Sequence, residues 1–228
     1  MGQLFIISTP IGNLEDISFR AINCLKEVSV VFSENPATSK KLFLKYSIST
    51  RLRKYNQHST HSLLKEILEL LRSDKKLALI SEAGTPGISD PGSLLISQIR
   101  QELPETEIIP IPGASALGAL LSVSGLGTDK FLFLGFLPHK KGRLKLLKEI
   151  AICKYSLVLY ESKHRFLKLL KELKEQGLAD REVLVGREMT KLNESFYFNT
   201  VSVLEEYFIN NPIETKGEFS LIIKKKHK

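Results

Sequence analysis

Three loops of this sequence combine glycine, proline and hydroxyl side chains, and each follows a short apolar run. The loops are Ser8–Leu14, Ser81–Gly92 and Pro110–Ala116. Prolines restrict the conformations of a loop, and glycines let a ligand approach the backbone closely. Because ligands of open α/β sheets bind outside the carboxyl ends of the strands, we predict that these loops hold a ligand.

The motifs in these loops narrow the kind of ligand. Neither the G-x-G-x-x-G pattern of dinucleotide-binding proteins nor a Walker A lysine is present. The turn through Pro112-Gly113 into small residues predicts a helix N-terminus, whose free N–H groups suit a carboxylate or a phosphate. Alternatively, this turn allows close packing of a helix on the sheet, and Ser8–Leu14 is only a tight turn.

Two segments in the second half of the chain carry groups that perform acid–base or phosphate chemistry. They are Tyr160-Glu161-Ser162-Lys163-His164-Arg165 and Gly186-Arg187-Glu188-Met189-Thr190-Lys191-Leu192-Asn193-Glu194. Each follows a predicted strand. Each segment is either a structural surface turn or a source of basic side chains and a carboxylate for a binding site.

The positive charge of the chain is concentrated in its second half. The 33 Lys+Arg against 25 Asp+Glu give a formal net charge of +8. Residues 1–113 hold 13 basic and 12 acidic side chains, whereas residues 114–228 hold 20 and 13, a net +7. Two clusters stand out, His139–Arg143 and Lys224–Lys228. The excess is either a lysine-rich solvated surface or a surface for a polyanionic partner.

Strands and helices in alternation must position these groups. Strand-length runs occur at Leu4–Ser8, Val28–Ser33, Leu77–Ser81, Glu107–Pro110, Phe131–Phe136, Leu157–Tyr160, Val183–Arg187, Glu194–Val201 and Gly217–Ile223. Helices are predicted between them, at Ser18–Lys26, His58–Arg72, Asp90–Arg100, Ala114–Val123, Gly142–Ile150, Lys163–Gln176 and Leu204–Ile209. The pattern predicts an α/β protein of two α/β domains, 1–113 with a mostly parallel sheet and 114–228 with a mixed sheet.

Composition excludes several classes of protein. Hydrophobic residues make up 43% and charged residues 25%, which are globular values and exclude a disordered or collagen-like chain. No apolar run approaches the roughly 20 residues of a membrane span, so we expect no membrane partner. Cys24 and Cys153 are far apart and lack metal-ligand spacing. We therefore expect a reduced cytoplasmic protein without a disulfide framework or a metal.

Taken in order along the chain, the motifs resemble one family. They are Thr9-Pro10-Ile11-Gly12-Asn13-Leu14, the Ser81–Gly92 loop, Pro112-Gly113-Ala114-Ser115-Ala116, Phe131–Pro138, Tyr160-Glu161-Ser162 and Arg187-Glu188-Met189-Thr190-Lys191. Over about residues 3 to 224 the chain is similar to ribosomal RNA small subunit methyltransferase I, a branch of the tetrapyrrole methylase superfamily. The Gly84–Gly92 run is specific to this branch, whereas the Pro112–Ser115 run is shared with the superfamily.

The resemblance implies a fold, a cofactor and a reaction. It implies two α/β domains of the tetrapyrrole methylase type, with S-adenosylmethionine in the cleft between them, in a homodimer. It also implies methyl transfer to the ribose 2′-hydroxyl of a cytidine in the decoding region of 16S rRNA. We expect the adenine to lie against apolar segments of the second domain. The expected cofactor-binding residues are Pro10, Gly12, Ala83, Gly84, Thr85, Pro112, Gly113, Ala114 and Ser115.

A ribose hydroxyl needs in-line alignment with the methyl group and benefits from a general base. The candidates are Lys191, if desolvation lowers its pKa, and Glu34 or Glu194. We favour Lys191 with Glu194 beside it, and the structural alternative for each candidate is a salt bridge at the domain interface. The expected substrate-binding residues are Arg187, which would meet RNA phosphate, His164, Arg165, Lys140 and Lys141.

The chain departs from the family pattern in three places. After Glu34 the family's Asp-Thr-Arg is replaced by Asn35-Pro36-Ala37, which removes side chains expected to contact substrate. Lys163 stands in place of a proline. Most members continue into a small C-terminal segment, whereas this sequence stops at Lys228, so we expect any extra RNA contact to come from the lysines already present. The rival hypotheses are a tetrapyrrole-type small-molecule methyltransferase and a non-catalytic RNA-binding relative.

Overall fold

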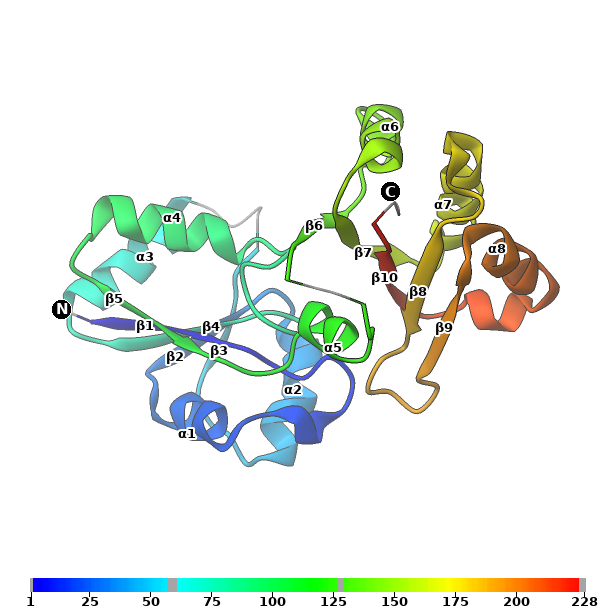
Figure 1. The fold of residues 1–228 in the computed structure, drawn as a ribbon. Coiled ribbons are helices and arrows are strands. Elements are labelled where there is room, and N and C mark those ends of the chain that lie inside the picture. Colours follow the sequence, from blue (N-terminus) through cyan, green and yellow to red (C-terminus); the bar gives the residue numbers. More distant parts are fainter. Residues whose placement is uncertain (1, 57–60, 127–128, 226–228) are drawn as a thin grey trace. The chain divides into compact units, whose positions relative to one another are not determined.

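The chain folds into two compact units, Met1–Ser115 and Ala116–Lys228 (Figure 1). The structure is a computed structural model that describes residues 2–56, 61–126 and 129–225. Each unit has a five-stranded sheet and its own hydrophobic core. The prediction of two α/β sheets is confirmed.

The sheet of the N-terminal unit is parallel throughout. Its strands are β1 (Gln3–Ile7), β2 (Val30–Ser33), β3 (Leu52–Lys54), β4 (Lys76–Ile80) and β5 (Glu107–Ile111). They lie in the order β3-β2-β4-β1-β5, and every neighbouring pair is parallel. The carboxyl ends of all five strands therefore meet at one edge of the sheet, which brings together the loops that follow β1, β2, β4 and β5.

Helices cover both faces of this sheet. They are α1 (Phe19–Glu27), α2 (Pro36–Lys45), α3 (His61–Arg72) and α4 (Gly92–Glu102), with a 3₁₀ turn at Leu14–Asp16. Side chains of α1 and α2 share one core with the sheet, and side chains of α3 and α4 share the other. Because the central strands are buried on both faces, they are almost continuously apolar. Ser18 caps α1 as predicted, since its hydroxyl accepts the N–H of Ala21 at 3.1 Å.

The C-terminal unit contains a mixed sheet. Its strands are β6 (Phe131–Phe136), β7 (Ser156–Ser162), β8 (Glu182–Arg187), β9 (Ser195–Thr200) and β10 (Glu218–Ile223), in the order β6-β7-β10-β8-β9. The pair β6/β7 is parallel, and the other neighbouring pairs are antiparallel. Strands β6, β7 and β8 consequently run in one direction, and the loops that follow them share one edge.

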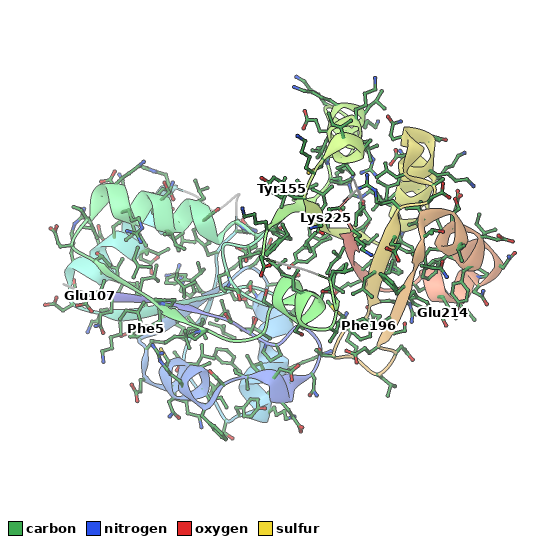
Figure 2. The ribbon with its side chains drawn as sticks, in the orientation of Figure 1. Phe5, Glu107, Tyr155, Phe196, Glu214 and Lys225 are labelled. Carbon is green, nitrogen blue, oxygen red and sulfur yellow. The ribbon has the colours of Figure 1, made fainter. Side chains whose placement is uncertain are left out.

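The helices of this unit pack on both faces of its sheet. They are α5 (Ala116–Ser122), α6 (Arg143–Ile152), α7 (Phe166–Leu173) and α8 (Val201–Asn210), with a π-helical turn at Lys174–Leu178 and a 3₁₀ turn at Pro212–Thr215. Side chains of α6, α7 and α8 form one core with the sheet (Figure 2). Phe166 stacks on Phe219 with ring centroids 3.9 Å apart. On the opposite face Gly186 lets α5 approach, because a Cβ there would lie 2.8 Å from Leu120 Cδ1.

Two elements occur where no element is predicted, α2 and β3. The signal for α2 is present, since the Asn35 side chain accepts the N–H of Ala37 at 3.2 Å and Pro36 occupies the first turn. Strand β3 is only three residues long and is not fully buried, so it has no clear apolar pattern. The predicted helix at His58–Arg72 begins at His61 in the described part of the chain, because residues 57–60 lie outside it.

The predicted cap of α4 is wrong in its details. Asp90 and Pro91 precede the helix, which begins at Gly92. Asp90 Oδ1 accepts the N–H groups of Gly87 and Gly92, both at 2.7 Å, so this carboxylate closes the loop onto the helix start. Likewise α5 begins at Ala116 rather than Ala114.

Candidate active site

Three loops at the carboxyl edge of the N-terminal sheet are tied to one another by hydrogen bonds. Thr9 and Gly84 exchange two backbone hydrogen bonds of 2.9 Å each, which join the loops after β1 and β4. The hydroxyls of Ser8 and Thr85 are 2.9 Å apart, and Thr85 Oγ1 donates to Ala114 O at 3.2 Å. The Thr85 hydroxyl therefore lies at the junction of all three loops.

Two glycines allow this close approach. Gly84 has φ of +80°, a region that L side chains rarely adopt, and a Cβ there would lie 3.4 Å from Ile11 Cγ2. A Cβ on Gly113 would lie 3.0 Å from Ser8 Cβ. A side chain at Gly113 would crowd Ser8, and a side chain at Gly84 would strain the backbone at its positive φ.

The predicted cofactor-binding residues all lie on these three loops. Pro10 and Gly84 are buried, Thr85, Ala114 and Ser115 are half-buried, and Gly12, Ala83, Pro112 and Gly113 are exposed. Buried polar contacts thus hold the loops in place while four of the nine residues offer exposed backbone. Their role in binding a cofactor stays a prediction.

Acidic side chains lie against the loop that follows β4. Glu34, directly after β2, lines a small cavity together with Tyr55, Ser81 and Asp90. Burial raises the pKa of Glu34, and the negative charges of Glu82 and Asp90 raise it further. This edge of the N-terminal unit therefore carries negative charge, which suits a positively charged ligand group better than a phosphate.

Exposed basic side chains gather at the carboxyl edge of β6 and β7 in the C-terminal unit. We call them the basic edge: His139, Lys140, Lys141, Lys163 and His164. The first three lie on the loop between β6 and α6, and the other two lie on the loop between β7 and α7. Three of the predicted substrate-binding residues, Lys140, Lys141 and His164, are therefore exposed on adjacent loops.

Lys191 does not have the lowered pKa expected of a base. Its Nζ lies 3.0 Å from Glu188 Oε1 and 3.0 Å from Glu218 Oε2. Partial burial lowers the pKa of Lys191, but the hydrogen bonds and charges of these two carboxylates outweigh it and raise the pKa overall. Lys191 is consequently a protonated ion-pair partner in this arrangement, and its pKa is raised overall instead of lowered as a base would require.

Glu194 also differs from the expected arrangement. Its Oε2 accepts the N–H of Thr190 at 2.6 Å, so the carboxylate closes the turn after β8, while Glu188 and Glu218 pair with Lys191. This turn is strained, because Glu188 and Thr190 have φ of 49° and 64°. Strained non-glycine residues are typical of functional loops.

The guanidinium groups of Arg187 and Arg165 bind partners within the C-terminal unit. Arg187, 7% exposed, donates to Lys216 O at 2.8 Å and to Asn193 O at 3.1 Å, and it pairs with Glu214 at 3.2 Å. Arg165 donates to Leu137 O at 2.8 Å and pairs with Glu161 at 2.7 Å. The phosphate contact predicted for Arg187 and the substrate contact predicted for Arg165 therefore compete with internal partners.

Four partner residues were not predicted as site residues: Arg143, Glu161, Glu188 and Glu218. Glu161 and Glu188 stand inside motifs that mark the ends of β7 and β8, so their positions were visible in the sequence. The pairing of Glu218 with Lys191 was not visible, because it depends on β10 lying between β7 and β8.

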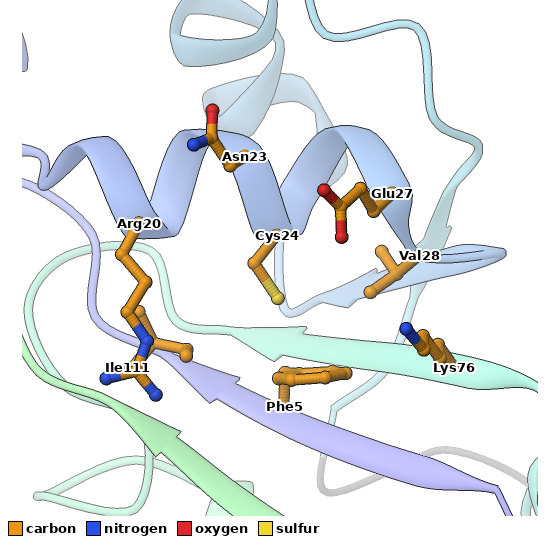
Figure 3. A pocket seen from close by; sticks show the side chains of 8 residues that line it. All are labelled: Phe5, Arg20, Asn23, Cys24, Glu27, Val28, Lys76 and Ile111. Atoms are coloured by element: carbon orange, nitrogen blue, oxygen red, sulfur yellow. The ribbon is translucent and has the colours of Figure 1, made fainter.

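A separate cavity of about 380 Å³ lies beside α1 (Figure 3). It is lined by Phe5, Arg20, Asn23, Cys24, Glu27, Val28, Lys76 and Ile111. None of the predicted cofactor-binding residues is among these. Burial raises the pKa of Cys24 to about 11, with a further contribution from the charge of Glu27, so this thiol stays protonated at neutral pH.

Two searches of the described residues concern metals and membranes. No group of three or more His, Cys, Asp or Glu side chains among residues 2–56, 61–126 and 129–225 is arranged to hold a metal ion. Within the same ranges, no helix has both the length and the apolar character needed to cross a bilayer.

Comparison with known sequences identifies close relatives. The profile of the Tetrapyrrole (Corrin/Porphyrin) Methylases matches residues 3–205. The chain is 40% identical to ribosomal RNA small subunit methyltransferase I of Thermotoga maritima over 223 residues, which cover 98% of each protein. It is 41% identical to the protein of the same name from Synechocystis over 224 residues, 98% of this chain and 79% of the relative.

Comparison with solved structures supports the same fold. A diphthine synthase is similar with a TM-score of 0.75 and 13% identity, covering 100% of this chain and 92% of that one. The methyltransferase CobJ is similar with a TM-score of 0.70 and 18% identity, covering 99% and 95%. A uroporphyrin-III C-methyltransferase from Thermus thermophilus in complex with S-adenosylhomocysteine is similar with a TM-score of 0.66 and 16% identity, covering 97% of each chain.

Proposed function

Because the chain belongs to the tetrapyrrole methylases and, within them, to the ribosomal RNA small subunit methyltransferase I family, we propose that it methylates the ribose 2′-hydroxyl of a cytidine in the decoding region of 16S rRNA. Methyltransferases of this family use S-adenosylmethionine, and we propose the same cofactor here. The reaction takes place on the small ribosomal subunit in the cytoplasm. We also propose that the enzyme works as a homodimer.

The observation that carries this proposal is the set of three tied loops at the carboxyl edge of the N-terminal sheet. Their internal hydrogen bonds run through Ser8, Thr9, Gly84 and Thr85, which leaves Ala83 and Gly113 exposed to a ligand. Ligands of parallel α/β sheets bind at such an edge. The negative charge of Glu34 and its acidic neighbours suits a cationic sulfonium.

The role of these residues is to bind and orient. S-adenosylmethionine, when bound, supplies an activated methyl group on a positively charged sulfur. The backbone of the three loops would hold the methionine portion in one orientation, because the loops cannot move independently. Such fixed orientation is a main source of rate enhancement in a direct transfer between two bound groups. The contact of the adenine with apolar segments of the C-terminal unit stays a prediction.

Among the three predicted bases, the structure favours Glu34. Its raised pKa makes the carboxylate a stronger proton acceptor than an ordinary glutamate, which general-base catalysis near neutral pH requires. Lys191 is protonated in its ion pair, and the Glu194 carboxylate is engaged by the N–H of Thr190. We therefore propose that Glu34 accepts the proton of the ribose hydroxyl.

The basic edge supports an RNA substrate. RNA phosphates bind a surface with several exposed basic side chains on adjacent loops in a salt-dependent way. In the proposed complex these residues contact the phosphate backbone of the RNA.

The proposal is tested by incubating the purified protein with small ribosomal subunits from a strain that lacks this activity and with labelled S-adenosylmethionine. Ribose-methylation mapping should locate one methylated cytidine in the decoding region. Calorimetry should detect binding of S-adenosylhomocysteine. Transfer to a tetrapyrrole but not to the subunit would favour the small-molecule hypothesis, and RNA binding without cofactor binding would favour the non-catalytic one.

Two variants distinguish Glu34 from Lys191 as the general base. Glu34→Gln should remove most of the methyl transfer while S-adenosylhomocysteine still binds, because the amide keeps the shape but accepts no proton. Lys191→Ala should retain far more transfer than Glu34→Gln. The opposite order of activities would identify Lys191, and not Glu34, as the base.

A further inference from the structure

A cluster of four buried charged side chains lies beneath the basic edge. It consists of Arg143, Glu161, Arg165 and Glu172, which we call the buried charge cluster. The Glu161 side chain is fully buried, and those of Arg143, Arg165 and Glu172 are 5%, 14% and 18% exposed. Charged residues are seldom buried this deeply unless they are paired. The mutual pairing of these four side chains is therefore what permits their burial in the C-terminal unit.

The pairs within the cluster are short and run through both arginines. Arg143 Nε and Nη2 donate to Glu172 Oε2 at 2.8 and 2.6 Å. Arg165 Nη2 lies 2.7 Å from Glu161 Oε1, and Arg143 Nη1 lies 3.7 Å from Glu161 Oε2. Within these four side chains two positive and two negative groups balance, and Lys168, 61% exposed, adds an outer contact to Glu172 Oε1 at 3.7 Å.

The same two arginines hold the start of the basic loop. Arg165 Nη1 donates to Leu137 O at 2.8 Å, and Arg143 Nη1 donates to Pro138 O at 3.1 Å. These carbonyls belong to consecutive residues directly before His139, Lys140 and Lys141. The loop then turns through Gly142, whose φ is +83°. One end of the loop is thus fixed by the cluster and the other by the start of α6.

The cluster also fixes the second basic loop. Glu161 lies near the carboxyl end of β7, and its Oε1 accepts the N–H of Ser162 at 2.8 Å. Arg165, which follows Lys163 and His164, points back to this carboxylate. The two loops that carry the basic edge therefore have one common anchor, the Glu161 side chain with its two arginines.

Resting on the proposed function, we propose that the buried charge cluster positions the basic edge for RNA phosphates. Arg143 and Arg165 act here as positioning residues and do not themselves meet phosphate. Loops that are already ordered lose less conformational entropy on binding, so their anchor contributes to RNA affinity without touching RNA. Glu161 Oε2 and Arg165 Nε are buried without a hydrogen-bond partner, so the cluster reduces the stability of the folded unit at these two atoms.

The positive charge of Arg165 alone does not explain why an arginine occupies this position. A lysine keeps the positive charge but lacks the planar fork that reaches a carboxylate and a carbonyl together. Arg165→Lys should therefore release Leu137 O and loosen the loop. Glu161→Gln tests the same anchor from the other side, because an amide cannot pair with both arginines.

The experiment measures binding and turnover on small ribosomal subunits. For Arg165→Lys and Glu161→Gln we expect KM for the subunit to rise by about tenfold, with kcat within about twofold and the affinity for S-adenosylhomocysteine unchanged. The slope of log affinity against log salt should fall by about 1 for each phosphate contact that is lost. The matched control is Glu205→Gln, a carboxylate 8% exposed and paired with Lys174 at 2.7 Å away from both loops. Its KM should equal that of the wild type.

A double-mutant cycle separates positioning from general destabilisation. In a Lys140→Gln/Lys141→Gln background, Arg165→Lys should have a clearly smaller effect on subunit binding than in the wild type, because two of the side chains that it positions are gone. Additive effects, or an equal rise in KM for Glu205→Gln, would overturn the inference. If the wild type binds subunits but transfers no methyl group, the proposed function fails while the binding cycle still decides this inference.

Discussion

Replacement of Thr85 by valine tests whether the three tied loops work as one unit. Valine keeps the shape of threonine but removes the hydroxyl that meets Ser8 Oγ at 2.9 Å and Ala114 O at 3.2 Å. Each net hydrogen bond contributes about 0.5–1.5 kcal/mol, so we expect a loss of about 1–3 kcal/mol in the free energy of unfolding of the N-terminal unit. Urea denaturation measures this loss.

The same change should weaken cofactor binding. If the loops separate enough to lose about 1.4 kcal/mol of binding free energy, the Kd for S-adenosylhomocysteine rises about tenfold, which calorimetry resolves. Thr50→Val is a matched control, because the Thr50 hydroxyl donates to Leu25 O at 2.6 Å in the same unit, away from the three loops. It removes one hydrogen bond, so it should cost about 0.5–1.5 kcal/mol of stability and leave the Kd unchanged. Equal Kd values for the two variants would refute the argument that Thr85 ties the binding loops together.

Three further predictions concern other parts of the chain. Lys191→Met should destabilise the protein at pH 7, and the difference in stability from wild type should shrink in acid and in strong base. The pKa of Glu188 is lowered, so the stabilisation from its carboxylate is lost as pH falls below about 4.5. The pKa of Lys191 is raised, so the stabilisation from its ammonium group is lost only at very high pH. Urea titrations across pH check this. In a Cys153→Ser background, alkylation of Cys24 at pH 8 should be about 100-fold slower in the folded protein than in urea, because folding raises its pKa from 9.0 to about 11. Mass spectrometry measures the alkylation rate, and equal rates in the two states would contradict the raised pKa. Phe208→Ala should cost about 3–5 kcal/mol, because this ring is fully buried among other aromatic rings, and a loss below about 1 kcal/mol would show that the core collapses around the gap.

The loops of the N-terminal unit were predictable because their signals are local. Glycine, proline and hydroxyl residues after an apolar run mark a strand that ends in a binding loop, and a parallel sheet brings such ends together. The family resemblance rests partly on the same segments, and the relatives confirm it. The hydrogen bond between Thr85 and Ser8 was not predictable, because these residues are 77 positions apart.

The surroundings of Lys191 were not predictable for a related reason. Its pKa depends on Glu218, which reaches the same edge only because β10 lies between β7 and β8. The sequence shows a strand near Glu218 but not its place in the sheet. The basic residues show a similar limit: Lys140 is exposed, whereas Arg165 is half-buried and paired with Glu161, and the sequence alone does not distinguish these two surroundings.

The pairing of Thr9 with Gly84 has a consequence for the folding of the protein. The two residues are 75 positions apart, and their bridge requires β1 to lie beside β4, a parallel pair with helices and two other strands in between along the chain. Contacts of such long range form late, because the entropy of closing the intervening loop is lost before the contact repays it. A ligand that needs all three loops in place can bind only after this long-range pairing has formed. Any ligand held by these loops stabilises the complete N-terminal unit against its partly folded forms.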